Sequence, residues 1–216
     1  VRLQGAGSET IINAVKSPPQ KLNAWRQKVK SLIDDGLVDL LPGQPAEFDL
    51  VGPGLFGAEL GAGITVLAKN DPGNDTGRSF LSGINPSRID GFTITGADGG
   101  GGIFVNGYAH NLVISNNNVT GNSGVLHGGI RVGQPYLPNP VPGAGGLFGY
   151  DRNLNIHHNA ITTNGSQGDN GVGGGLALCT GTDNYTVSRN YVCGNVSLGD
   201  GGGIGHVGLS SPGRVE

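Results

Sequence analysis

The sequence predicts an all-β fold, a parallel β-helix in which the chain winds as successive coils from about residue 88 to residue 207. Three observations support this prediction. An asparagine-rich segment repeats, each copy leads into a glycine block and another short apolar strand, and the chain has 43 glycines among 216 residues but only 13% charged residues. The glycines follow no strict three-residue period, which excludes collagen. The recurring β-branched segments are not typical of disordered chains.

The asparagine-rich repeat occurs in three copies that align without a gap, at 111–122, 153–164 and 184–195. Alternating apolar residues give each copy one apolar face. We expect two columns of stacked amides that hydrogen-bond along the coils, at backbone corners with left-handed conformation. These columns are Asn117, Asn159 and Asn190, and Asn122, Asn164 and Asn195. A degenerate fourth copy, without the asparagines, is placed at 92–94.

The spacing of the second strands sets the coil length. Their anchors, Ile103, Ile130, Leu176 and Ile204, are 27, 46 and 28 residues apart. The long interval contains a Pro- and Gly-rich loop insertion at 134–150. A period near 27 residues returns each strand to its counterpart, so neighbouring strands pair in parallel and each coil buries the apolar face of the next. Segments 3–7, 11–13 and 63–67 are predicted as earlier coils.

Segment 17–35 departs from the β pattern. Ser17 is a candidate N-cap, Pro18 suits the first helical turn, and Gly36 is a natural end. One helix face collects the apolar residues Leu22, Trp25, Val29, Leu32 and Ile33. We predict a helical excursion that packs on the coils, with a partner-binding helix as the alternative.

The chain as a whole, 1–216, is expected to be a single β-helix domain. It has no Met and opens within a strand-like pattern, so we expect a piece of a longer protein. The net charge is −3, and basic residues cluster only around 21–30 at helical spacing, so no nucleic-acid partner is expected. No apolar run approaches the roughly 20 residues of a membrane span. Cys179 and Cys193 are spaced for neither a redox pair nor a zinc site, which leaves a disulfide or two free thiols.

The repeat resembles that of right-handed parallel β-helix proteins, the pectate-lyase-like superfamily and its surface-protein relatives. The resemblance rests on the three asparagine copies and on the segment Arg-Ile-Asp-Gly-Phe-Thr-Ile-Thr at 88–95, and it covers about 80–210. It implies right-handed coils and an extracellular or cell-surface location. Enzymes of this superfamily act on polysaccharides. Its lyases use an Arg base with Ca²⁺ held by acids, and its hydrolases need two spaced carboxylates.

Four residues are candidates for a substrate site: Arg131, Asp151, Asn155 and His157. Arg131 is the only charged residue in its outward column and fits a sugar-carboxylate clamp, a lyase base or a surface Arg without such a task. Asp151 follows the insertion and is expected to line the same groove. We align Asn155 with Val113 and Thr186.

His157 aligns with Ser115 and Ser188, with Thr95 before them. His157 and His158 are expected on opposite faces of a strand, so they would not share a metal. No acid pair falls on one outward column. Acids in turns, Asp183 among them, are expected to bond their own backbone.

These observations predict a structural or glycan-binding β-helix module of a larger secreted or cell-surface protein. The alternative is a polysaccharide lyase or glycoside hydrolase with Arg131, Asp151 and His157 lining its cleft. Expected partners are a polysaccharide or other domains of the same protein. No cofactor or metal is expected, except Ca²⁺ if the chain is a lyase.

Overall fold

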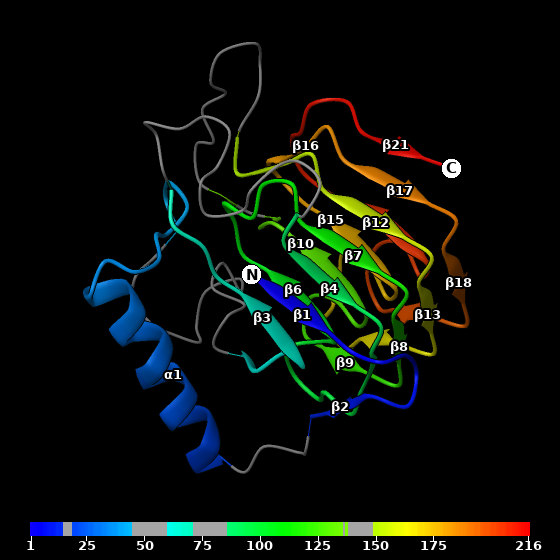
Figure 1. Cartoon of the computed structure of the whole chain (residues 1–216), viewed down its shortest axis with the longest axis horizontal. Helices are drawn as coiled ribbons and strands as arrows, with labels where there is room; N and C mark the ends of the chain where they lie inside the picture. The colour runs from blue at the N-terminus through cyan, green and yellow to red at the C-terminus, as the bar shows by residue number, and fades with distance from the viewer. Residues whose placement is uncertain (15–18, 45–59, 71–85, 136, 138–148) are drawn as a thin grey trace.

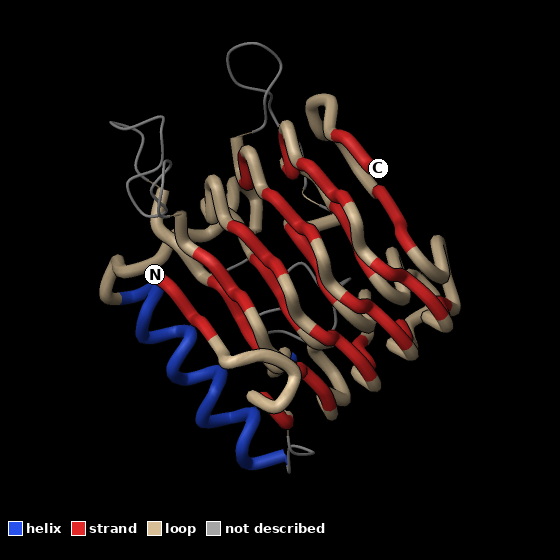
Figure 2. Tube along the Cα trace, turned by 45° about the vertical axis from the view of Figure 1, so that its right-hand side comes forward, coloured by secondary structure: helices blue, strands red, loops and turns tan. Residues whose placement is uncertain are grey.

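The computed structural model describes residues 1–14, 19–44, 60–70, 86–135, 137 and 149–216. The protein is predominantly β, with one helix, and all of its paired strands run parallel (Figure 1). Strands stack in long rows that run from the N-terminal end of the chain to its C-terminal end (Figure 2). This arrangement is compatible with the predicted parallel β-helix.

Three sheets contain most strands. The first sheet has the order β1-β4-β7-β12-β17-β21, which are Arg2–Gln4, Arg88–Asp90, Val113–Ser115, Asn155–His157, Thr186–Ser188 and Arg214–Val215. The second has the order β2-β5-β8-β13-β18, which are Ile11–Asn13, Thr93–Thr95, Asn118–Thr120, Ala160–Thr162 and Tyr191–Cys193. The third has the order β20-β15-β10-β6-β3, which are Ile204–His206, Leu176–Leu178, Ile130–Val132, Ile103–Val105 and Ile64–Val66.

Two shorter sheets contain the remaining strands. They are β9-β14-β19, at Ser123–Gly124, Gly165–Ser166 and Val196–Ser197, and β11-β16, at Asp151–Arg152 and Thr182–Asp183. The core lies between the sheets. The first and second sheets contribute the middle residue of each strand, such as Ile114 and Ile161, and the third contributes the two flanking residues, such as Ile130 and Val132. The alternation seen in the sequence therefore decides which side chains are buried.

The register confirms the alignment of the three asparagine copies and of the strands that follow them. The degenerate copy was misplaced. Ile89, not Ile94, lies in the column of Ile114, and Ile94 lies in the column of Val119. The residue before Ser115 in its outward column is therefore Asp90, whereas Thr95 belongs to the second sheet. This shift puts an acid where the sequence predicted a hydroxyl.

The two asparagine columns form buried hydrogen-bond ladders, as predicted. Asn159 Oδ1 accepts bonds from the backbone N–H and Nδ2 of Asn117, both at 3.0 Å. Asn159 Nδ2 donates to Asn190 Oδ1 at 2.9 Å and to the Ile114 carbonyl at 2.9 Å. The second ladder repeats this pattern through Asn164. These amides satisfy the backbone groups that the corners would otherwise leave unpaired.

The left-handed backbone is not at these asparagines, as the sequence suggested, but at the residue before each one. Asn116, His158 and Arg189 have φ values of 54°, 55° and 55°, and Gly91 occupies the equivalent corner with φ 78°. The ladder asparagine points inward, so the corner residue before it points outward. We call Gly91, Asn116, His158 and Arg189 the corner column.

The single helix, α1, spans Pro19–Asp34 and lies beside the strand rows (Figure 1). Its predicted cap, Ser17, lies outside the described residues. Its predicted end is confirmed: Gly36 has φ 63°, its N–H bonds the Ile33 carbonyl, and the N–H of Leu37 bonds the Leu32 carbonyl. This pair of bonds is a Schellman motif. Within the described chain, no helix is long and apolar enough to span a membrane.

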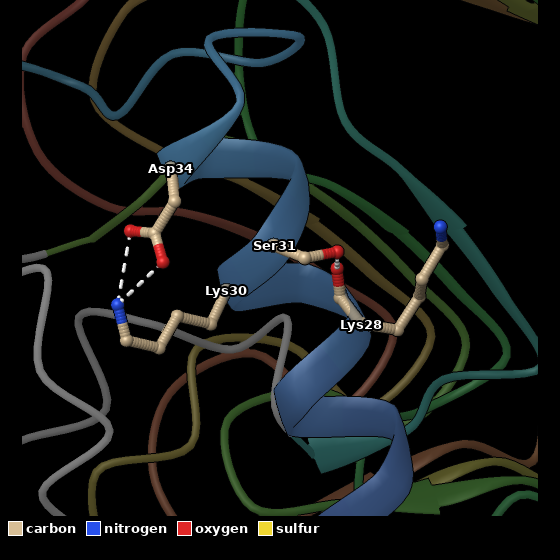
Figure 3. A network of polar contacts seen from close by, with 4 residues as sticks. All are labelled: Lys28, Lys30, Ser31 and Asp34. Carbon is tan, nitrogen blue, oxygen red and sulfur yellow. Dashed lines mark hydrogen bonds and ion pairs between the residues drawn. The ribbon is translucent and has the colours of Figure 1, made fainter.

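The two sides of α1 differ in their contacts. Val29 is fully buried against Phe104 of the third sheet, with Trp25 and Ile33 packed around them. Figure 3 shows polar side chains of the helix, where Lys30 Nζ pairs with Asp34 at 2.7 Å and the Ser31 hydroxyl donates to a backbone carbonyl. Because the ion pair is exposed, it contributes little stability. Both partners of the ion pair lie on α1, so it does not attach the helix to the sheets. The packing of α1 on Phe104 does.

Candidate functional site

Arg131 is buried, which overturns both its expected roles at a groove and its interpretation as a surface residue. Its side chain has no exposed surface, and its Cζ atom lies 4.0 Å from the centroid of the Phe104 ring. The register places it next to Phe104, as predicted. The packing of α1 on Phe104 covers this part of the outer face of the third sheet. A polymer therefore has no access to the guanidinium group.

Asp151 is also fully buried and lines no groove, contrary to expectation. Its Oδ1 accepts a hydrogen bond from the Ala109 N–H at 3.0 Å, and its Oδ2 has no partner among the described residues. Burial raises the pKa of this carboxyl well above its usual value, and the charge of Asp183 raises it further. The prediction that Asp183 bonds the backbone of its own turn is wrong. Its carboxylate accepts hydrogen bonds from the N–H groups of Gly149 and Ser211. Both acids are therefore structural.

Replacing Asp151 by Asn should flatten the dependence of stability on pH. Because the folded protein holds the Asp151 proton above the ordinary pKa of 3.8, the stabilisation from that proton is fully present below pH 3.8. It is lost as the pH rises through the folded pKa. We therefore measure the free energy of unfolding by urea denaturation between pH 4 and 8. It should decrease more steeply with rising pH in the wild type than in Asp151→Asn. Equal slopes would contradict the assignment.

His127 is the necessary reference in that comparison. Burial lowers its pKa well below 6.5, and the neighbouring charge of Arg131 adds to this effect. Its contribution to stability therefore falls as the solution is acidified below pH 6.5, opposite in sign to that of Asp151. Both proteins retain His127, so its effect cancels in the difference between them.

The other two candidates, Asn155 and His157, lie on the outer face of the first sheet, on strand β12. His157 lies in the outward column formed with Asp90, Ser115 and Ser188 on successive strands. Ser115 Oγ donates to Asp90 Oδ1 at 2.6 Å, and Asn116 Nδ2 donates to the same oxygen at 2.7 Å. The structure thus brings an acid, a hydroxyl and an imidazole into one line.

The hydrogen bonds at Asp90 keep its carboxylate charged. Burial acts to raise the pKa of Asp90, but the bonds from Ser115 and Asn116 and the charge of Arg88 outweigh burial, and the net shift is downward. The Ser115 hydroxyl donates to this carboxylate rather than to an imidazole. The line therefore lacks the order nucleophile, base and orienting acid that a serine hydrolase needs.

His157 and His158 lie on the same side, which corrects the prediction that they point to opposite faces. Their Nδ1 atoms are 2.8 Å apart. The strand ends at His157, and the left-handed backbone of His158 turns the second ring back toward the first. Burial lowers the pKa of His157, and His158, Arg189 and Arg88 lower it further against the opposing effect of Asp90.

Acids are sparse on this face. Among the described residues of the first sheet and its ends, the outward acids are Asp90 and Glu216, and Glu216 pairs with Arg214. They are separated by four strand spacings of about 4.8 Å, roughly 19 Å in total. Glycoside hydrolysis needs carboxylates about 5–10 Å apart. In contrast, Arg2, Arg88, Arg189 and Arg214 give the face a positive charge on a chain whose net charge is −3.

The cysteines and metal ligands add no second site. Cys179 and Cys193 are free thiols, one buried and one exposed, so the disulfide alternative is not realised. Burial raises the pKa of the Cys179 thiol to about 12. Within the described part of the chain, no three His, Cys, Asp or Glu side chains are grouped to hold a metal ion. Most of the predicted insertion at 134–150 lies outside the described residues.

Sequence reasoning missed Asp90 and Arg189. The signal for Asp90 was the glycine that follows it, because Gly91 matches the corner position of Asn116 and fixes the register. Arg189 could be found in the same way, since it aligns with His158 immediately before a ladder asparagine. Comparisons with protein-family models, with curated proteins and with solved structures give no match.

Proposed function

We propose that this chain is a β-helix module that binds an extended, acidic polysaccharide along the outer face of its first sheet. The observation that carries the proposal is an outer face of six parallel strands that is mostly polar and bears four arginines, Arg2, Arg88, Arg189 and Arg214. Stacked coils repeat such a surface at regular intervals, which suits a polymer better than a small molecule. Arginine recognises carboxylates by paired hydrogen bonds.

The right-handed winding and the location on a secreted or cell-surface protein are part of the same proposal. The asparagine and glycine repeat supports the first, because it resembles that of right-handed β-helix proteins. The paucity of charged residues in the coils and the polar, unreactive outer face support a binding or structural role. Arg131 is buried, so it is not available as the base of a lyase. The described residues also contain no acid pair with the spacing that a hydrolase needs.

The test measures binding of polygalacturonate and of neutral dextran by affinity electrophoresis. The double variant Arg88→Gln and Arg189→Asn removes two charges from the face, and Asn suits the left-handed corner. We expect polygalacturonate to slow the wild type and the double variant to bind at least tenfold more weakly. Dextran should have little effect.

The matched control is Lys28→Gln with Lys30→Gln, which removes two charges from exposed positions of α1. This control should bind as the wild type does. If both double variants lose binding equally, net charge rather than the first sheet is responsible. If the wild type binds neither polymer, the proposed function is wrong.

A further inference from the structure

The paired rings of His157 and His158 have a geometry that strand pairing alone does not require. Their centroids are 5.1 Å apart, their planes are nearly perpendicular at 89°, and the Nδ1 atoms face each other at 2.8 Å. His158 has φ 55°, which is uncommon for a residue other than glycine. The equivalent corners hold Gly91, Asn116 and Arg189, so the imidazole pair occurs in one coil only.

We propose that His157 and His158 chelate a divalent transition-metal ion of the nickel or copper type on the outer face of the first sheet. Imidazole nitrogens suit copper, nickel, zinc and iron. Two nitrogens 2.8 Å apart, each about 2.1 Å from a metal, subtend an angle of about 85° at that metal. Square-planar and octahedral complexes have neighbouring ligands near a right angle, as copper(II) and nickel(II) prefer.

Zinc fits this pair less well. A tetrahedral angle of about 109° with bonds of about 2.1 Å needs nitrogens about 3.4 Å apart. To hold zinc, the two nitrogens would have to move apart by roughly 0.6 Å. The site therefore favours an ion with right-angled ligands, and its remaining positions are filled by water.

The surroundings set the strength of binding. Neutral imidazole is the form that binds metals. Arg88 and Arg189 oppose a cation, whereas Asp90 favours it. With two protein ligands and nearby arginines, binding is weaker than at a structural metal site. The site does not depend on polysaccharide binding.

The competing explanation is a hydrogen bond between the rings, in which one Nδ1–H donates to the other Nδ1. Metal binding requires both rings to carry their protons on Nε2, so the ion replaces this bond. The explanations differ in what they predict. Only a chelating pair binds one ion per chain through both histidines.

Titration calorimetry of the protein with nickel chloride tests the proposal. We expect one nickel ion per chain, and at least tenfold weaker binding in either His157→Gln or His158→Asn. Asn is chosen at 158 because Asn116 occupies the equivalent corner. The control His206→Gln removes an exposed histidine that contacts Ser210 at the C-terminal end of the third sheet, and it should bind nickel as the wild type does.

Two results would overturn the proposal: wild-type affinity retained in both single variants, or an equal loss in the His206 control. A second measurement does not require the histidine variants to fold. Copper(II) bound to the Cys193→Ser protein, which lacks the exposed thiol, should show two imidazole nitrogens by pulsed electron paramagnetic resonance. One imidazole or none would exclude the chelate.

Discussion

Replacing Asn159 by Ala should lower the free energy of unfolding by about 3–5 kcal/mol, near the upper range for single substitutions. The substitution removes the acceptor of the Asn117 N–H and the side-chain donor to the Ile114 carbonyl, and it leaves Asn190 Oδ1 only the bond from the backbone N–H of residue 159. Each unsatisfied buried polar group is destabilising by about 1–3 kcal/mol. Urea denaturation followed by circular dichroism measures the loss.

The matched control is Asn155→Ala. Asn155 lies four residues earlier on the outer face, and its Oδ1 is buried but accepts no hydrogen bond within the described chain. Because no hydrogen bond to this oxygen is lost, its replacement should change the free energy of unfolding by less than about 1 kcal/mol. A loss at Asn159 no larger than that at Asn155 would show that the ladder contributes no more than an outward amide.

The second large effect is expected at Gly129, which precedes strand β10. A Cβ atom there would overlap the carbonyl oxygen of Gly175 in the next coil and approach Ile161 Cγ2 at 3.0 Å and Asn164 Nδ2 at 3.1 Å. The carbonyl belongs to the backbone and accepts the N–H of Ile130, so it cannot move without breaking the pairing. We expect Gly129→Ala to lower the free energy of unfolding by about 3 kcal/mol.

Gly165→Ala is the control for this prediction. A Cβ atom at Gly165 meets only the Val196 carbonyl oxygen, at an ordinary contact distance of 3.8 Å. Alanine also restricts the unfolded chain, so the control should be neutral or more stable by up to about 1 kcal/mol. Thermal denaturation of both variants separates the two cases. Similar melting temperatures would mean that the coils adjust their spacing freely.

The sequence predicted well what depends on local alternation and repetition. The three complete copies aligned because each carries its ladder asparagines, and the end of α1 followed from Gly36. The first full coil was misaligned because it lacks those asparagines, so Ile94 was matched to Ile114, whose counterpart in the structure is Ile89. The left-handed corner at Gly91 was the feature that could have fixed it.

The candidate site was predicted less well, for a physical reason. Alternation tells which side of a strand a residue occupies, but not what covers that side. Arg131 was correctly placed outside the coil, yet α1, from a distant part of the chain, packs on the neighbouring Phe104. The proximity of His157 and His158 depends on a positive φ at a residue other than glycine, which strand periodicity does not describe.

The corner column also bears on how this surface can change. Four chemically different residues, Gly91, Asn116, His158 and Arg189, already occupy one backbone position. At the last three corners the next residue is an inward asparagine that holds the turn, so the outward side chain is exchangeable without repacking the interior. A library that varies only these corners should yield folded proteins with altered ligand preference. The positions that tolerate substitution would then be the same positions that determine which ligand the surface binds.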